Sequence, residues 1–446
     1  MTDKLVLNRR ECFTGLATAA LLPLSGSGKV TTSPNAGRPR WAAVQQVLDA
    51  FVAEGIAAGT AVAIAFGDEP PAYPSAGTLA FGSAVAFDEH SICRLASITK
   101  NVTRIAALLL VEDGRIELDQ PVADVLPEFR SLHVAIDIEK GLASRPARNT
   151  MTMRHLITNT SGLGSWTPGS DGGDELHAVY RERGITPGNS GSGRKRPGYG
   201  PQVFDLDEMV ARVAELPLAY EPGTVLHYSI GFDVMGLVIE RVSGKGYDTF
   251  LEERLFAPLD MSSTGFQVEE KDAARLTTNY DATRAGVNSA SSPGVDANAP
   301  AGFRVRDAGA TSDWLTKPSL LTGGGGLVST ARDFFRYGGM LLGEGTFEGA
   351  RVMKPETAQL ALSDLKPGGV ANPSAGIGAG SRAMLQNPLT PPGTFGGGGA
   401  TSTLFWIDRA RRGNVVFLTQ TIWEGGPANV PYPRRLFAAI EESLKS

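Results

Sequence analysis

Residues 93–114, CRLASITKNVTRIAALLLVEDG, combine a long apolar helical pattern with a serine and a lysine at its start. Apolar residues recur every three or four positions, and the pattern ends at Asp113-Gly114, as a helix with a glycine cap does. Other apolar residues fall on the remaining faces, so we expect a helix that is buried on almost every side. Ser97 and Lys100 lie three residues apart, which places them on one face at the beginning of this helix.

A serine beside a buried lysine can act as a nucleophile. Burial lowers the pKa of a lysine, so that a neutral amine becomes available to take the hydroxyl proton. The free N–H groups at the helix start can also bind a developing anion. Two further Ser-x-x-Lys copies, Ser192–Lys195 in a glycine-rich loop and Ser363–Lys366 before a proline, lack this setting. The local pattern is equally compatible with an N-capping Ser97 and a Lys100 that reaches into solvent.

The two ends of the chain both favour strands, whereas the middle is mostly helical. The expected elements are helices at Trp41–Gly55 and Arg434–Lys445, and strands at Gly59–Phe66, within Gly77–Phe87, at Ser402–Asp408 and at Asn414–Gln420. Strands from both ends can share one sheet only if the middle is inserted as a second lobe. We therefore expect a single domain over residues 40–446, with a sheet lobe at about 40–95 and 320–446, a helical lobe at about 96–320, and a cleft between them.

Length, composition and charge exclude several classes of protein. The 446 residues, of which 42% are hydrophobic and 20% charged, suit a soluble globular chain with one large domain or two interlocked ones. The net charge of -5 leaves no basic surplus for nucleic acid. The two cysteines and five histidines lack the spacing of metal ligands, so we expect no metal and no cofactor. No run of about 18 apolar residues occurs, so we expect no membrane span.

The first 28 residues resemble an export signal. Arg9-Arg10 precede a mildly apolar stretch, Phe13–Leu24, and small residues follow it. This order is typical of a bacterial twin-arginine signal, so we expect an exported protein, periplasmic or extracellular. The alternative is a frayed N-terminal helix on a cytoplasmic protein.

Six motifs, in order along the chain, resemble those of the superfamily of serine β-lactamases, penicillin-binding proteins and family VIII carboxylesterases. They are CRLASITK at 93–100, LDQP with VLPEF at 118–129, MTMRHLITNTSGL at 151–163, EPGT with YS at 221–229, GGGGLVSTARD at 323–333 and FGGGGATSTLFWID at 395–408. The resemblance covers about residues 40–440, and the chain is most like the family VIII carboxylesterases. It implies an α+β, β-lactamase/transpeptidase-like fold, in which terminal helices flank an antiparallel sheet and a mostly helical lobe is inserted.

The resemblance also implies a role for each residue of the site. Ser97 attacks the substrate carbonyl, while Lys100 and Tyr228 share the proton transfer, and which of the two is the base stays open. The backbone N–H groups of Ser97 and Ala400 form an oxyanion hole, for which a glycine-rich strand edge permits the close approach. The expected pocket residues are Gly397, Gly398, Gly399, Ile230 and Asn159.

Two departures from the penicillin-recognising members favour an ester as the substrate. Ile230 stands where those members have an amide side chain, and Gly397 stands where they carry a cation for the β-lactam carboxylate. We therefore expect a carboxylesterase-like serine hydrolase that acts on short acyl or other small-molecule esters through an acyl-enzyme on Ser97. The alternatives are an amide hydrolase (β-lactamase, D-aminopeptidase or oligoamide hydrolase), an acyltransferase with the same site, and a non-catalytic binding protein; the oligomeric state stays open.

Three long loops, at 165–202, 282–316 and 366–394, are expected to shape the pocket.

Overall fold

The computed structural model describes residues 39–165, 174–185, 203–282, 296–370, 394–424 and 431–445. The expected export signal at 1–28 and the Ser192–Lys195 copy lie outside these residues, as do large parts of the three expected loops. Among the helices of the described residues, none has the length and apolar character that crossing a membrane requires.

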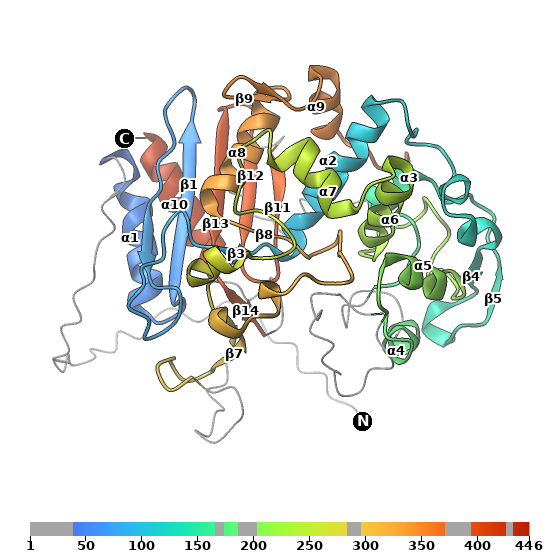
Figure 1. Cartoon of the computed structure of the whole chain (residues 1–446), viewed down its shortest axis with the longest axis horizontal. Helices are drawn as coiled ribbons and strands as arrows, with labels where there is room; N and C mark the ends of the chain where they lie inside the picture. Colours follow the sequence, from blue (N-terminus) through green and yellow to red (C-terminus); the bar gives the residue numbers. More distant parts are fainter. Residues whose placement is uncertain are drawn as a thin grey trace, which may run out of the picture. The chain divides into compact units, whose positions relative to one another are not determined.

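A five-stranded antiparallel sheet joins the two ends of the chain (Figure 1). Its strands, in spatial order, are β11 (Phe395–Gly398), β12 (Leu404–Asp408), β13 (Gly413–Leu418), β1 (Gly59–Phe66) and β2 (Ser75–Gly77). The central pair is β1 with β13, which runs in register from Ala61 opposite Leu418 to Phe66 opposite Gly413. The predicted strand at Gly59–Phe66 is confirmed, and the two predicted C-terminal strands coincide with β12 and β13 to within about two residues.

The strand predicted within Gly77–Phe87 is mostly wrong. Only Gly77 belongs to a strand, β2, and beyond it a single bridge joins Thr78 to Ala86. The physical reason is Gly82, whose φ of +73° turns the chain back on itself in the middle of the apolar pattern.

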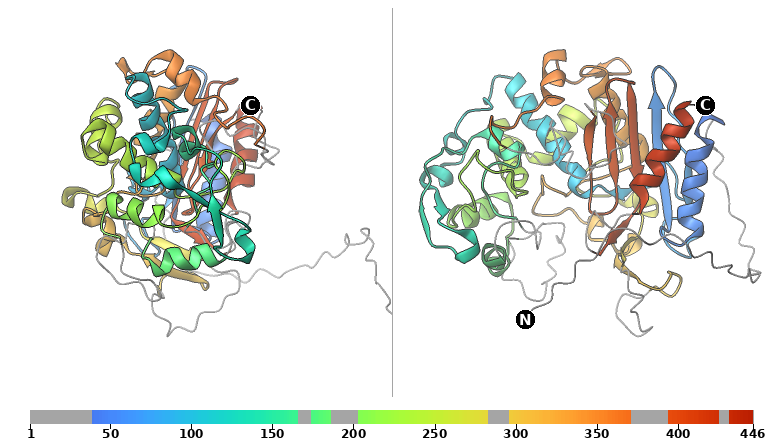
Figure 2. Two further views of the ribbon diagram at one scale, coloured as in Figure 1. Left: turned by 90° about the vertical axis from the view of Figure 1, so that its right-hand side faces the viewer. Right: turned by 180° about the vertical axis from the view of Figure 1, so that it is seen from behind.

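Helices cover both faces of the sheet. α1 (Ala42–Ala53) and α10 (Tyr432–Lys445) lie side by side on one face, and α8 (Ala331–Leu342) packs on the other (Figure 2). Alternate side chains of β1 serve the two layers, because successive residues of a strand point to opposite faces. Val62, Ile64 and Phe66 pack in the cluster with α1 and α10, and Ala61, Ala63 and Ala65 join the main core. Because both faces of β1 are buried, its sequence is a continuous apolar run.

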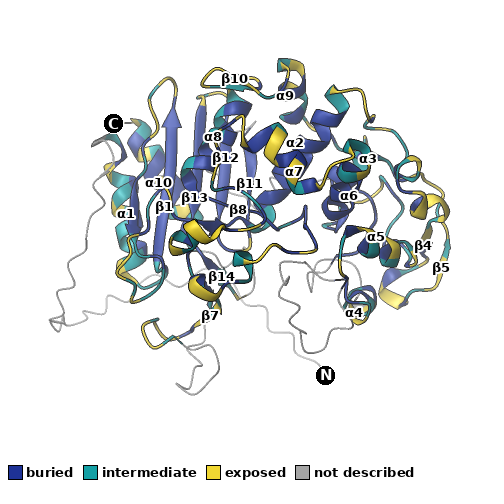
Figure 3. Ribbon diagram, in the orientation of Figure 1, coloured by how far each residue is buried: buried dark blue, intermediate teal, exposed yellow. Residues whose placement is uncertain are grey.

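The helix that follows the serine lies deep in the molecule. A short 3-10 turn, Ala96–Ile98, leads into α2 (Thr99–Glu112), and every residue of α2 up to Leu110 is buried (Figure 3). The chain leaves the helix at Asp113 and Gly114, which has a φ of +67°. The predicted helix, its glycine cap and its burial on nearly every side are confirmed. Neighbours on three sides are α6 (Gly231–Ser243), α3 (Met153–Ile157) and α9 (Pro355–Ala361).

The rest of the middle segment is less uniformly helical than expected. Its remaining helices are α4 (Asp174–Glu182), α5 (Leu206–Ala214) and α7 (Tyr247–Leu251), and its short strands are β4 (His133–Ala135), β5 (Ser144–Pro146), β6 (Asn279–Ala282) and β7 (Phe303–Asp307). Further short strands lie outside it, namely β3 (Cys93–Arg94), β8 (Val328–Ser329), β9 (Thr346–Phe347) and β10 (Ala350–Arg351). β6 pairs with β7 and, in parallel, with β14 (Thr421–Trp423). Part of the expected 282–316 loop is therefore the strand β7, which pairs with β6, and α4 interrupts the expected 165–202 loop.

The layers define the fold class. An antiparallel sheet carries the terminal helices on one face, and a largely helical segment is inserted between its strands (Figure 1). The predicted α+β architecture is confirmed. Ser97 lies in the 3-10 turn between the strand β3 (Cys93–Arg94) and α2.

Candidate active site

Ser97 is held in place by the backbone on either side of it. The preceding strand β3 pairs with β8, and the Leu95 N–H donates to Leu327 O at 2.9 Å. The hydroxyl of Thr403 donates to Leu95 O at 3.1 Å, which ties this segment to the C-terminal strands. Ala96 has a φ of +49°, a left-handed conformation that costs a non-glycine residue about 1 kcal/mol. A strained residue directly before Ser97, fixed from two sides, gives the serine a defined orientation.

The structure brings Ser97 and Tyr228 into direct contact. Ser97 Oγ and Tyr228 Oη lie 2.6 Å apart, the separation of a short hydroxyl–hydroxyl hydrogen bond. Both residues are partly exposed, so a substrate can reach them. Tyr228 lies in the loop just before α6. Asn159 holds this loop through two hydrogen bonds. Asn159 O accepts from the N–H of His227 at 2.8 Å, and its Oδ1 accepts from the N–H of Ser229 at 3.3 Å.

Lys100 lies under the aromatic ring of Tyr228. Its side chain is buried at 8% exposure, and Nζ lies 4.5 Å from the centroid of the Tyr228 ring and 5.9 Å from that of Phe232. Nζ donates to the carbonyl oxygen of Gly324. In the described part of the chain, no hydrogen bond joins Lys100 to Ser97. The expected cluster of three residues therefore exists, but Tyr228 is the direct partner of Ser97 and Lys100 contacts Tyr228.

A buried carboxylate completes this cluster, and sequence reasoning missed it. Asp233, on the first turn of α6, is 1% exposed, and its Oδ1 accepts from the N–H of Gly324 at 3.0 Å. Burial raises the pKa of Asp233 to about 6, although the charge of Lys100 opposes this increase. The signal in the sequence was a single acidic residue in the apolar start of a helix, five positions after Tyr228.

The glycine-rich strand β11 lies against the serine segment. A Cβ at Gly399 would come within 2.3 Å of both Leu95 O and Thr403 Oγ1, so only glycine permits this approach. The next residue, Ala400, is exposed beside the Ser97 segment. The structure thus brings together the two segments expected to form the oxyanion hole, and the role of their N–H groups stays a prediction. Gly397 and Gly398 lie on β11 at the edge of the sheet, opposite Phe405 and Leu404 of β12.

All five expected pocket residues are buried, among them Ile230 and Asn159. The side chain of Ile230 is fully buried in the main core, and its N–H donates to Gly164 O at 3.1 Å. Asn159 is 3% exposed and faces the Tyr228 loop, as described above. In this arrangement both residues support the loop that carries Tyr228, and their contact with a substrate stays a prediction.

The described residues near Ser97 contain neither a cluster of metal ligands nor a reactive thiol. Among the described residues, no group of three or more histidine, cysteine, aspartate or glutamate side chains could hold a metal ion. Cys93 lies four residues before Ser97 and is fully buried. Burial raises the pKa of its thiol to about 12, so this sulfur stays protonated and unreactive at neutral pH.

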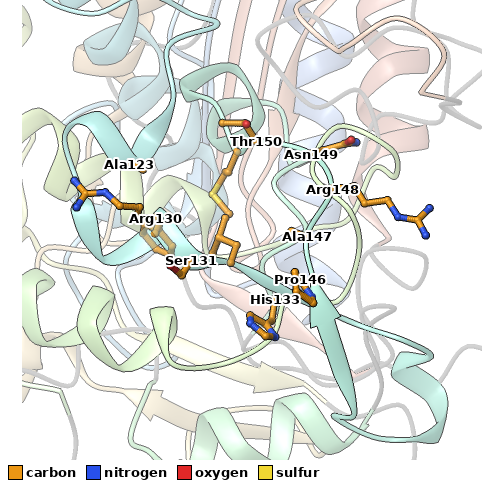
Figure 4. Close-up of a pocket in the computed structure, with 12 residues that line it drawn as sticks. Ala123, Arg130, Ser131, His133, Pro146, Ala147, Arg148, Asn149 and Thr150 are labelled. Atoms are coloured by element: carbon orange, nitrogen blue, oxygen red, sulfur yellow. The ribbon is translucent and has the colours of Figure 1, made fainter.

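A cavity of about 440 Å³ lies elsewhere, between the 3-10 helix Pro127–Ser131 and the β4–β5 hairpin (Figure 4). Its walls include the exposed side chains of Arg130 and Arg148, which point in opposite directions in the close-up. It shares no residue with the Ser97 cluster. We therefore treat it as separate from the candidate active site.

Sequence comparison places the chain in a family that fits this geometry. A serine at a helix start, a tyrosine in contact with it and a buried lysine are the parts of an enzyme that acts through a serine nucleophile. The chain belongs to the beta-lactamase family, whose family model matches residues 44–438. The resemblance noted from the six motifs, and the fold it implied, are confirmed.

Two relatives illustrate the range of the family. Esterase EstB of Burkholderia gladioli is 31% identical over 363 residues, which are 78% of this chain and 83% of EstB. An uncharacterised protein of Mycobacterium tuberculosis is 31% identical over 283 residues, 63% of this chain. That match spans only 61% of the mycobacterial protein.

Solved structures agree with the family assignment. EstCE1, described as a hydrolase with promiscuous acyltransferase activity, is 25% identical with a TM-score of 0.67, and the match covers 90% of this chain and 98% of EstCE1. The unliganded simvastatin synthase LovD of Aspergillus terreus, 18% identical, has a TM-score of 0.64 over 92% of this chain and 98% of LovD. LovD shares the fold. The chain is thus a member of a serine hydrolase superfamily with esterase and acyltransferase homologues.

Proposed function

We propose that this protein hydrolyses small carboxylic esters through an acyl-enzyme on Ser97. The observation that carries the proposal is the 2.6 Å contact between Ser97 Oγ and Tyr228 Oη, with the buried Lys100 against the Tyr228 ring. A hydroxyl becomes a useful nucleophile when a base lies within hydrogen-bond reach of it. The similarity to an esterase over most of the chain supports the same reading.

The geometry suggests the following order of steps. Tyr228, acting in its phenolate form, accepts the proton of Ser97 as Oγ forms a bond to the ester carbonyl carbon. The N–H groups of Ser97 and Ala400 stabilise the negative charge on the carbonyl oxygen. The tetrahedral intermediate collapses, the C–O bond of the ester breaks, and the leaving alkoxide takes the proton from Tyr228. Water then attacks the acyl carbon while Tyr228 accepts one of the water protons. The second tetrahedral intermediate collapses, the bond from the acyl carbon to Ser97 Oγ breaks, the carboxylic acid leaves, and Tyr228 passes the proton to Oγ.

The side chains beside the serine favour an uncharged substrate. Gly397, on the edge strand next to the serine segment, has no side chain and no charge. Ile230, where penicillin-recognising relatives have an amide, is apolar and buried. Without a cation at position 397, that position has no charge-assisted bond to offer the carboxylate of a β-lactam. A short neutral ester needs no such partner.

The test is turnover of 4-nitrophenyl acetate and butyrate by the wild type and by Ser97→Ala. We expect Ser97→Ala to lose about a thousandfold or more in rate. Ser363→Ala is the matched control, since Ser363 begins another Ser-x-x-Lys sequence and donates to Leu360 O away from the site. It should keep the wild-type rate. If Ser97→Ala keeps most of the activity, the proposal is wrong.

Mass spectrometry separates hydrolysis from acyl transfer. An acyl adduct on Ser97 should appear in intact protein after brief incubation with the ester, and it should be absent from Ser97→Ala. Adding a simple alcohol then tests the second candidate function, which the description of EstCE1 favours. Faster loss of the adduct together with a new ester would support acyl transfer, whereas release of free acid alone would support hydrolysis.

A further inference from the structure

We propose that Asp233 is a positioning residue of this site, whose buried carboxylate fixes Gly324 and, through the carbonyl oxygen of Gly324, holds Lys100 against the Tyr228 ring. The inference rests on the proposed function, because it assigns a task within the same site. It concerns a residue outside the expected group of Ser97, Lys100 and Tyr228.

Gly324 connects the two charged groups. Asp233 Oδ1 accepts from the N–H of Gly324 at 3.0 Å, and the carbonyl oxygen of Gly324 accepts from Lys100 Nζ. The carboxylate and the ammonium therefore hold opposite ends of one residue. Any movement of Asp233 shifts the acceptor that fixes the amine of Lys100.

Gly323 and Gly324 lie close against Phe232 and Asp233 at the start of α6. A Cβ at Gly324 would lie 2.7 Å from Asp233 Oδ2 and 3.2 Å from Oδ1. A Cβ at Gly323 would lie 2.3 Å from the carbonyl oxygen of Phe232. Both distances are too short for a side chain, so only glycine allows this segment to lie against the start of α6. Close packing thus brings the carboxylate to the backbone.

A purely structural role explains the carboxylate poorly. Asp233 is buried, and its second oxygen, Oδ2, has no hydrogen-bond partner in the described part of the chain. Burying a charge with so few partners is destabilising, and a neutral residue would fill the same space at less cost. A buried carboxylate at position 233 is explained if its charge interacts with another charged group. Lys100 is that group, because its charge favours the ionised form of Asp233.

The surroundings of Asp233 leave Lys100 as its cation. Among the described residues, the ionisable groups that face it are Lys100 from α2 and Tyr247 from α7. Arg104, one turn further along α2, instead donates to Ile157 O at 2.8 Å and lies over the other aromatic neighbour, Phe232. No charged group of α3 or α5, the other described helices packed on α6, contributes to the titration of Asp233.

This arrangement favours Tyr228 as the base. The amine of Lys100 donates to the carbonyl oxygen of Gly324, and among the described residues no hydrogen bond joins it to Ser97. Tyr228 contacts Ser97 directly and is therefore the group placed to take the serine proton. Asp233 contributes by acting on Lys100, without touching the substrate.

The experiment compares Asp233→Asn with Asp333→Asn. Asn keeps the size and the Oδ1 acceptor of Asp233 but removes its charge. We expect kcat for 4-nitrophenyl butyrate to fall roughly tenfold or more, with KM within about twofold. In the wild type, kcat should decline as the pH falls below about 6, where the Asp233 carboxylate takes up a proton. This decline should be absent from Asp233→Asn, which has no carboxylate at that position. Asp333 is also buried at the start of a helix and accepts from the N–H of Ser263 at 2.8 Å, and its variant should keep both kcat and the pH profile.

The outcomes separate this inference from the proposed function. An active wild type with an Asp233→Asn variant of unchanged kcat would overturn the role of Asp233 while leaving the esterase proposal in place. A lower kcat with an unchanged pH profile would also overturn it, because the loss would then be structural. If Asp233→Asn does not fold, Gly324→Ala provides the second test. It keeps the charge but displaces the carboxylate from Lys100, and an unchanged kcat in that variant would contradict the inference. A wild type that neither turns over esters nor forms an adduct would remove the proposed function itself.

Discussion

Replacing Tyr228 with phenylalanine removes one oxygen atom from the centre of the site. The ring stays, so its contact with Lys100 at 4.5 Å is retained, while the 2.6 Å contact with Ser97 Oγ is lost. A positioned base contributes about 10²- to 10⁴-fold to a rate, which corresponds to about 3–5 kcal/mol in the activation barrier. Losing one hydrogen bond at a partly exposed position lowers the free energy of unfolding by only about 1 kcal/mol. We therefore expect a large loss of kcat in a protein that stays folded.

The assay measures kcat and KM with 4-nitrophenyl butyrate alongside thermal unfolding. Tyr432→Phe is the matched control, because the Tyr432 hydroxyl donates to Ile56 O on the far side of the sheet. Tyr432→Phe should lower the free energy of unfolding by about the same 1 kcal/mol and leave kcat unchanged. If Tyr228→Phe stays folded and keeps more than about a tenth of the wild-type kcat, Tyr228 is not the base.

Three further predictions follow from the packing and the charges of the site and its neighbourhood. Gly399→Ala should reduce kcat/KM by about a hundredfold, because the new Cβ pushes the Ala400 segment away from Leu95 O and weakens the oxyanion hole. Arg94→Met should lower the free energy of unfolding in urea by about 3 kcal/mol, because the buried guanidinium donates to Asp307 at 2.7 Å. The pKa of Asp233 is raised to about 6 from 3.8, so the folded state binds this proton more tightly than the unfolded state. We therefore compare the free energy of unfolding of the wild type with that of Asp233→Asn at each pH. The difference, wild type minus variant, should fall by about 2–3 kcal/mol as the pH rises from about 4 to 7, and it should stay constant above about pH 7.

Each of these predictions has a control or an outcome that contradicts it. Gly368→Ala places a Cβ in open space and should leave kcat/KM unchanged. Arg412→Ala removes an exposed ion pair with Asp68 and should alter the unfolding free energy by less than about 1 kcal/mol. For Asp233, a difference between wild type and variant that is constant across pH would show that the carboxyl titrates normally.

Local periodicity was sufficient to predict the elements that are buried on all sides. β1 and α2 were correctly placed because an uninterrupted apolar run and a three-to-four residue repeat have few other solutions. The contacts among Ser97, Tyr228 and Lys100 were expected from the ordered motifs rather than from periodicity. The paired segments β6, β7 and β14 were missed, and the pairing of β6 with β14 joins residues more than a hundred positions apart, which local patterns do not reveal.

The parts of the site that the sequence did not reveal depend on long-range packing. Asp233 can be recognised only once Gly324 is known to lie against α6, and the two are 91 positions apart. Ile230 and Asn159 were expected to face a substrate, because the motif positions do not say which way a side chain points. Their burial follows from the loop they support, which is a property of the assembled fold.

The pairing of β1 with β13 affects how the chain can be made. The first strand to leave the ribosome hydrogen-bonds to one of the last, so its apolar faces have no partner during most of synthesis. The oxyanion donors expected at Ala400 also come from this late segment. A nascent or truncated chain that stops before β11 should therefore be an inert species that depends on chaperones. The proposed hydrolysis would therefore require the C-terminal strands to be in place.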